Sequence, residues 1–150
     1  MRKLMIVSFA TVVLGASGLA FADSSYELKI DAPKAKKAQK GVAKIHVTPG
    51  AGFHVNKDYP TKFKAEDIAN VEFQGTDPAG KNVFSKAKND FVLGPDDAAA
   101  KGPVTGWMTV TFKGKSAGAA KITGKLKLSV CNEANCQMET ADVSVPVTVK

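Results

Sequence analysis

Apolar and polar residues alternate along most of the chain after residue 25, as they do in strands with one buried and one exposed face. The alternation is clearest on both sides of a short polar segment, residues 132–135. The apolar positions before and after this segment are Ile122, Leu126, Leu128 and Val130, and Val143, Val145, Val147 and Val149. Two alternating runs joined by a short polar link predict a β-hairpin, with Cys131 and Cys136 at the ends of its loop.

The other alternating runs are short and are separated by glycine, proline and other turn-forming residues. Residues 65–69 have the composition of one helical turn, 77–80 that of a tight turn, and 94–103 that of a loop or a single helical turn. In the run that precedes the hairpin, Val104, Gly106, Met108, Val110 and Phe112 have the inward parity. We predict further strands over 26–30, 41–48, 53–56, 61–64, 71–74, 82–84, 90–93 and 104–112.

Many short strands, regular turn signals and the lack of a long helical period are typical of two packed antiparallel sheets. We therefore expect an all-β fold, an immunoglobulin-like antiparallel β-sandwich. A small β-barrel is the alternative.

The first residues have the pattern of a secretory leader rather than of a domain. Met1, Arg2 and Lys3 form a positive start, an apolar run follows over 4–14, and Ala20-Phe21-Ala22 is a small-x-small cleavage pattern. We expect a signal peptide over 1–22 and one domain over 23–150, soluble and exported to the periplasm or beyond. No later apolar run approaches twenty residues, so we do not expect the domain to be embedded in a membrane.

The formal net charge of the 150-residue chain is +7, and Arg2, inside the expected leader, is its one arginine. Proteins that read nucleic acids rely on arginine's bidentate contacts, and no basic patch with interleaved aromatic residues is present. We therefore expect no nucleic-acid binding. The lysines predict a solvated, positively charged surface.

The cysteine pair is the strongest candidate for chemistry. If paired positions in the hairpin sum to 267, Cys131 lies opposite Cys136 on the outer face, and Cα atoms about 4.5–5.5 Å apart permit a disulfide. Exported chains meet oxidising conditions, so we expect this disulfide to form. Its small loop stabilises the fold by about 2 kcal/mol, and exposure on the outer face permits exchange with another thiolate. The same register turns Gln137 and Glu139 inward, which predicts a bulge near Met138 or a rim where these side chains reach water.

Other chemistries have weaker support. His46, His54, Met108, Met138 and the two cysteines are ligand types for Cu(I), but they are scattered along the chain and an oxidised pair cannot ligate as thiolates. Zinc spacings and a Gly-x-Ser-x-Gly nucleophile motif are not present in the sequence, so we expect no metal site and no cofactor. Trp107, on the outward parity of its strand, is either a packing residue or a partner contact.

The hairpin sequence Cys131-Asn132-Glu133-Ala134-Asn135-Cys136, together with Gly52-Phe53-His54-Val55-Asn56 and Tyr59-Pro60, resembles the N-terminal periplasmic domain of the DsbD thiol:disulfide interchange proteins. This disulfide bond corrector family has an immunoglobulin-like fold, and its cysteine pair shuttles electrons to periplasmic oxidoreductases. The resemblance implies that Cys131 and Cys136 are a redox pair and that thioredoxin-like or other thiol oxidoreductases are partners. Family members commonly have Pro-Pro soon after the second cysteine, where this chain has Gln137-Met138-Glu139.

Two hypotheses of different classes therefore stand at this point. In the first, the domain passes electrons between Cys131/Cys136 and partner thiols, an oxidoreductase-like activity. In the second, it is a non-catalytic binding or structural module whose disulfide fastens a hairpin. Copper binding is a third possibility. The residues leave the partner, the direction of electron flow and the oligomeric state open.

Overall fold

The computed structural model describes residues 24–75, 82–94 and 104–150, so the expected leader and the predicted turn at 77–80 lie outside the described residues. The described chain is almost entirely strand and loop, with one short 3-10 helix, η1 (Lys86–Lys88). The strands are β1 (Tyr26–Asp31), β2 (Lys34–Ala35), β3 (Lys40–Pro49), β4 (His54–Val55), β5 (Lys62–Ala65), β6 (Val71–Phe73), β7 (Val83–Ser85), β8 (Phe91–Leu93), β9 (Gly106–Gly114), β10 (Gly118–Cys131) and β11 (Cys136–Val149).

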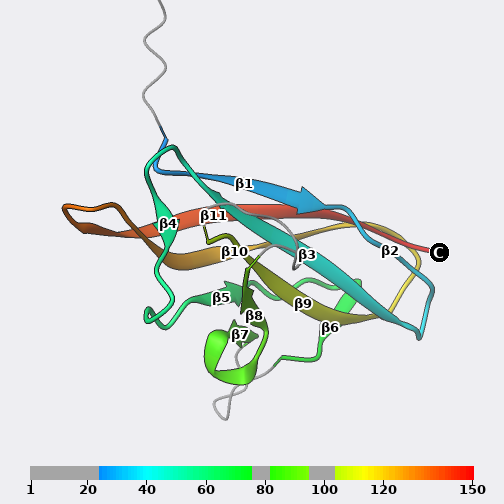
Figure 1. Ribbon diagram of the computed structural model, residues 1–150. Helices are drawn as coiled ribbons and strands as arrows, with labels where there is room; N and C mark the ends of the chain where they lie inside the picture. Colours follow the sequence, from blue (N-terminus) through cyan, green and yellow to red (C-terminus); the bar gives the residue numbers. More distant parts are fainter. Residues whose placement is uncertain (1–23, 76–81, 95–103) are drawn as a thin grey trace, which may run out of the picture.

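The strands form two sheets (Figure 1). The first sheet has the order β1-β3-β9-β6, with β8 also paired to β9. The second has the order β2-β11-β10-β5-β7, with β4 also paired to β10. The first sheet thus follows the A-B-E-D order and the β11-β10-β5 part of the second follows the G-F-C order of immunoglobulin domains. The protein is an immunoglobulin-like antiparallel β-sandwich, as the sequence predicts.

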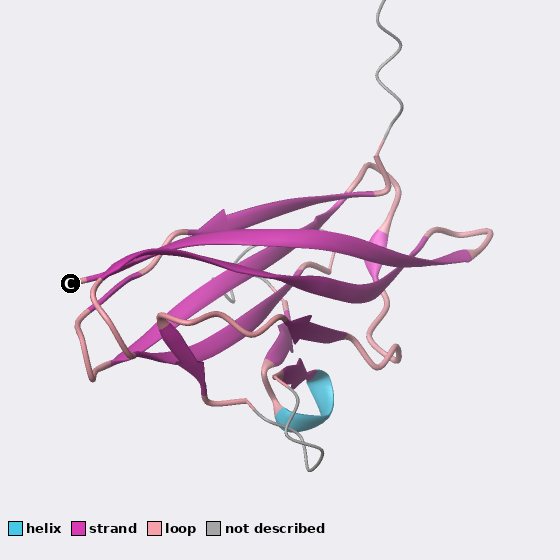
Figure 2. Cartoon of the chain, turned by 180° about the vertical axis from the view of Figure 1, so that it is seen from behind, coloured by secondary structure: helices cyan, strands magenta, loops and turns pink. Residues whose placement is uncertain are grey.

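Figure 2 shows the long strands running along the molecule, with η1 at its periphery. Within the described ranges, no helix has the length and apolar character needed to cross a membrane.

The β10–β11 hairpin has the register expected from its alternation. Pairing runs without interruption from Gly118 opposite Val149 to Cys131 opposite Cys136, and each pair sums to 267. Gln137 and Glu139 are half-buried, and the continuous register leaves no bulge near Met138. The rim explanation is therefore correct. The strand β11 lies toward the edge of its sheet, where inward-facing polar side chains still reach water.

The core between the sheets is built from the inward parity of the long strands and from a group of phenylalanines. Phe63 and Phe84 are fully buried and stacked, with ring centroids 6.4 Å apart, and Phe73 meets Phe84 edge-on at 6.1 Å. A Cβ at Gly124 would lie 2.8 Å from the Phe63 ring, so the glycine in β10 makes room for that ring. The other largest fully buried side chains are Phe112, Ile45, Met108, Ile122, Leu126, Leu128, Val47, Val55, Val110 and Val130.

Two local predictions are wrong. Residues 65–69 are not helical, because the Ala65 N–H donates to Asn82 O and the Glu66 N–H donates to Thr123 O, which continues sheet-like bonding past β5. Val104 is 41% exposed and precedes β9, so the inward parity begins at Gly106. In both places, partners distant in sequence decide the local structure.

We predict that Phe63→Ala lowers the free energy of unfolding by about 3–5 kcal/mol, because it removes a fully buried ring and leaves a cavity between the sheets. Chemical denaturation with the disulfide intact measures the change. Val42→Ala is the control, since Val42 is 42% exposed, and we expect it to cost less than about 1 kcal/mol. Similar losses for the two variants would show that the phenylalanine group does not hold the sheets together.

Candidate functional site

The tip of the β10–β11 hairpin carries the disulfide, and Figure 1 shows this tip, in orange, projecting at one end of the sandwich. Cys131 and Cys136 are bonded, with Cα atoms 4.0 Å apart, as the predicted register requires. The loop between them is shaped by Asn132, whose Oδ1 accepts hydrogen bonds from the backbone N–H groups of Ala134 (2.9 Å) and Asn135 (2.8 Å). Asparagine is favoured in turns because its side chain can form a hydrogen bond with the backbone two residues later.

The two cysteines differ sharply in exposure. Cys131 is 6% exposed because β10 is an inner strand, flanked at this position by Cys136 of β11 on one side and by His54 of β4 on the other. Cys136 begins β11 and is exposed. The expectation that both sulfurs are open on the outer face is therefore wrong for Cys131. An outward parity gives exposure only where no neighbouring segment covers the strand.

The covering segment follows β4. The Asn56 N–H donates to Ser129 O (2.9 Å), and the Asn56 Nδ2 lies 3.4 Å from Ser129 Oγ. Asn56 Oδ1 also accepts from the Asp58 N–H at 3.0 Å, which shapes the turn after it. Ser129 is 1% exposed as a result, although it shares the outward parity of β10. The segment thus covers the outward face of β10 beside Cys131, whereas Cys136 is exposed.

A cavity of about 670 Å³ lies beside the disulfide. Both cysteines border it, together with residues of the β4 segment and with Leu93, Val104 and Asn132. Its walls combine apolar and polar groups, as do the binding sites of small ligands. The site therefore places an exposed cysteine, Cys136, at the rim of a surface hollow.

His54 is the residue at this site that the sequence did not connect with the cysteines. It lies directly opposite Cys131 in the β4–β10 pairing, is exposed, and lines the same cavity. Its position depends on a two-residue strand that pairs with a segment more than seventy residues later. The glycines before His54 and the short apolar alternation around it predicted a strand, but they did not show that this strand pairs with β10.

The remaining candidate residues are dispersed. His46 Nε2 lies 3.1 Å from Asp31 Oδ2 on the outer face of the first sheet, Met108 is in the core, and Met138 is 77% exposed. In the part of the chain that the structure describes, no group of three or more His, Cys, Asp or Glu residues could hold a metal ion. Trp107 is half-buried opposite His46, with the Lys44 Nζ 5.9 Å from its ring centroid, so it packs within its own sheet.

The arrangement can support thiol chemistry at one sulfur. Exchange needs a thiolate to approach a disulfide sulfur along the S–S bond, and it depends on access. Cys136 is accessible, whereas Cys131 is enclosed by β4 and β11. The charged groups around the pair are mixed, with Lys57 and Asp58 on the cavity wall and Glu133 exposed on the loop.

Neither a family model nor a curated protein sequence matches the chain. Among solved structures, it is similar to AggA, the major subunit of aggregative adherence fimbriae type I from Escherichia coli, with 9% identity, 85% of this chain and 97% of that chain covered, and a TM-score of 0.38. It is also similar to the ASH / PapD-like domain 7 of human CEP192, with 13% identity, 99% and 98% of the chains covered, and a TM-score of 0.31. At these values neither protein identifies a function for this chain.

We predict that the double variant C131A/C136A remains folded and loses about 2 kcal/mol of unfolding free energy, because the disulfide closes a short loop and constrains the unfolded chain little. Denaturant titration of the variant and of the reduced wild-type protein measures the loss. An unfolded variant, or a loss above about 4 kcal/mol, would show that the bond holds the sandwich together.

Proposed function

We propose that this domain exchanges its Cys131–Cys136 disulfide with the thiols of partner proteins. The observation that carries the proposal is the asymmetry of the pair, in which an exposed Cys136 at the rim of a cavity is bonded to a buried Cys131. A disulfide with one open sulfur has a defined point of attack and a defined leaving group. The short loop fits this role, since such a bond adds only modestly to stability.

The first step is attack of a partner thiolate on the Cys136 Sγ. The partner's sulfur forms a bond to Cys136, the Cys131–Cys136 bond breaks, and its electron pair leaves on the Cys131 sulfur. Because a buried thiolate is poorly solvated, the Cys131 sulfur takes up a proton. We propose His54, which is opposite Cys131 in the strand pairing and open to solvent, as the donor of that proton.

The second step releases the reduced domain. A second thiolate of the partner attacks the partner's own sulfur in the mixed disulfide, and the electron pair of that bond leaves on Cys136, which takes a proton from the solvent. The partner is now a disulfide, and the domain is a dithiol that has gained two electrons and two protons. The reverse sequence reduces the disulfide of another partner, so the domain transfers electrons between thiol proteins.

The partners that fit this chemistry are dithiol proteins, such as thioredoxin-like oxidoreductases. The resemblance of the cysteine hairpin to the DsbD N-terminal family supports the same assignment. The leader-like residues 1–22 support an exported, periplasmic site of action, where such exchange takes place.

The redox potential of the pair tests the proposal. We expect a value above about −300 mV, because an exchanging pair must be reducible by other thiol proteins. Equilibration of the protein in thiol buffers of graded potential, followed by alkylation and mass analysis, gives the value. A potential well below about −300 mV would favour the other hypothesis, a binding or structural module with an inert hairpin bond.

Single variants test which of the two sulfurs is attacked. C131S leaves Cys136 as the free thiol, and C136S leaves Cys131. We expect the thiol of C131S to react with the neutral disulfide 4,4′-dithiodipyridine at least about ten-fold faster than that of C136S, because exchange depends on access.

Both variants should react at similar rates in denaturant, which controls for intrinsic thiol reactivity. Faster reaction of the folded C136S variant would contradict the assignment of Cys136 as the attacked sulfur.

A further inference from the structure

The outer face of the second sheet carries a compact group of lysines. In the pairing of β5 with β10, Lys125 lies directly opposite Lys64 and Lys127 directly opposite Lys62. All four side chains are exposed. Neighbouring strands are about 4.8 Å apart and alternate residues of one strand about 6.7 Å apart, so four ammonium groups share a small area. We call Lys62, Lys64, Lys125 and Lys127 the lysine square.

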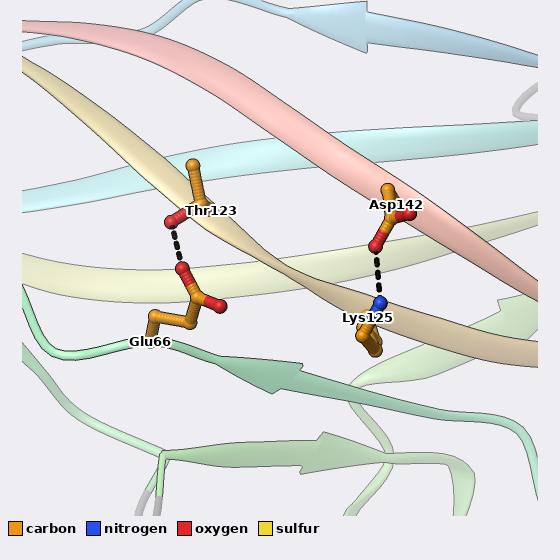
Figure 3. A network of polar contacts seen from close by, with 4 residues as sticks. All are labelled: Glu66, Thr123, Lys125 and Asp142. Atoms are coloured by element: carbon orange, nitrogen blue, oxygen red, sulfur yellow. Dashed lines mark hydrogen bonds and ion pairs between the residues drawn. The ribbon is translucent and has the colours of Figure 1, made fainter.

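Most of the positive charge of the lysine square has no acidic partner among the described residues. Like charges directly opposite each other destabilise a sheet, so such pairs are not favoured by folding alone. Lys125 Nζ contacts Asp142 Oδ1 of β11 at 2.6 Å, as Figure 3 shows, and this hydrogen bond and charge raise the pKa of Lys125. Within the described ranges, Lys62, Lys64 and Lys127 have no ion-pair partner. Three positive charges therefore remain open to an external anion.

Two carboxylates act on the square, and both act on Lys125. Asp142 bonds it, and the charge of Glu66, which follows β5 and accepts a hydrogen bond from Thr123 Oγ1 at 2.6 Å (Figure 3), also raises its pKa. Thr140, opposite Lys127, is uncharged. Among the described residues, neither carboxylate forms an ion pair with Lys62, Lys64 or Lys127.

The lysine square lies on the same strip of surface as the disulfide. From the pair Cys131 and Cys136, the outward positions run through Ser129 and Met138 to Lys127. Lys127 is four residues from Cys131, which is about 13 Å along the strand. Met138, between them, is 77% exposed. One molecule can therefore contact the reactive sulfur, an apolar side chain and the positive charges together.

Building on the thiol exchange proposed above, we propose that the lysine square docks an acidic surface of the partner protein and so brings the partner's cysteine to Cys136. Complementary charge raises association rates and selects partners, and its effect is greatest at low salt. The exposed Met138 matches the composition of protein interfaces, in which methionine is enriched. A lipid surface is bound by a broad apolar face with basic charge, whereas Ser129 beside Met138 is covered by the segment after β4 and Thr140 is polar, so Met138 is not part of a broad apolar face.

The test uses two peptides that reduce the disulfide. The acidic peptide is Cys-Gly-Ser-Asp-Glu-Asp-Glu, whose spacer and acidic end span the distance from Cys136 to the square, and the neutral peptide is Cys-Gly-Ser-Asn-Gln-Asn-Gln. We expect the acidic peptide to reduce the wild-type protein about ten-fold faster at low ionic strength. The advantage should disappear in about 0.5 M salt, which screens exposed charges.

The variant K62Q/K64Q/K127Q should lose this preference while its reaction with the neutral peptide is unchanged. The control K29Q/K40Q/K113Q removes the same charge from exposed lysines of the first sheet and should keep the preference. Equal rates of the two peptides with the wild-type protein would overturn the docking proposal and leave the exchange function standing.

A third peptide, with serine in place of cysteine in the acidic sequence, separates docking from chemistry. Its binding is followed by shifts in nuclear magnetic resonance spectra and should depend on the lysine square. If this peptide binds but neither cysteine peptide reduces the disulfide, only the exchange function is rejected. Lysine-dependent binding to phosphatidylglycerol vesicles without binding of the serine peptide would overturn the choice of a protein partner.

Discussion

The pairing of β10 with β11 is the constraint on which the rest of the structure depends. Its register runs unbroken from Gly118 and Val149 to the disulfide, and a shift by one residue would turn Leu126, Leu128 and Val145 out of the core. The buried side chains thus hold the register, and the register in turn places the two cysteines opposite each other. The disulfide follows from the hairpin rather than creating it.

The different places of the two strands in their sheet explain why the two cysteines differ in exposure. β10 is an inner strand, with β11 on one side and β4 and β5 on the other, whereas the first residues of β11 have a neighbour only on the β10 side. Cys131 is therefore enclosed and Cys136 is open. An inner and an outer strand give two chemically identical residues different roles, and the proposed exchange uses that difference.

The same strand order also brings charge to the site. β5 pairs with the middle of β10 and β4 with its end, so the lysine pairs and the cover over Cys131 lie along one strand. A partner that met this strip would find positive charge, an exposed methionine and the open sulfur in sequence. The fold thereby joins the proposed recognition surface to the proposed reactive sulfur without a dedicated loop for either.

Pattern alone was enough to predict the elements whose alternation is long and regular. The alternating runs 122–130 and 143–149 predicted the hairpin and its register, because a buried face with a period of two excludes a shift by one residue and the short polar link between the cysteines limits larger shifts. The short, evenly spaced strand patterns were sufficient to predict the β-sandwich. Other features became visible only in the folded structure. These are the low exposure of Cys131 and the position of His54 opposite it. They also include the pairing of the β5 lysines with those of β10 and the strand-like path of residues 65–66. These features depend on pairing between segments that lie 17 to 77 residues apart in the chain. Local periodicity shows which face a residue occupies but not which strand will lie next to it.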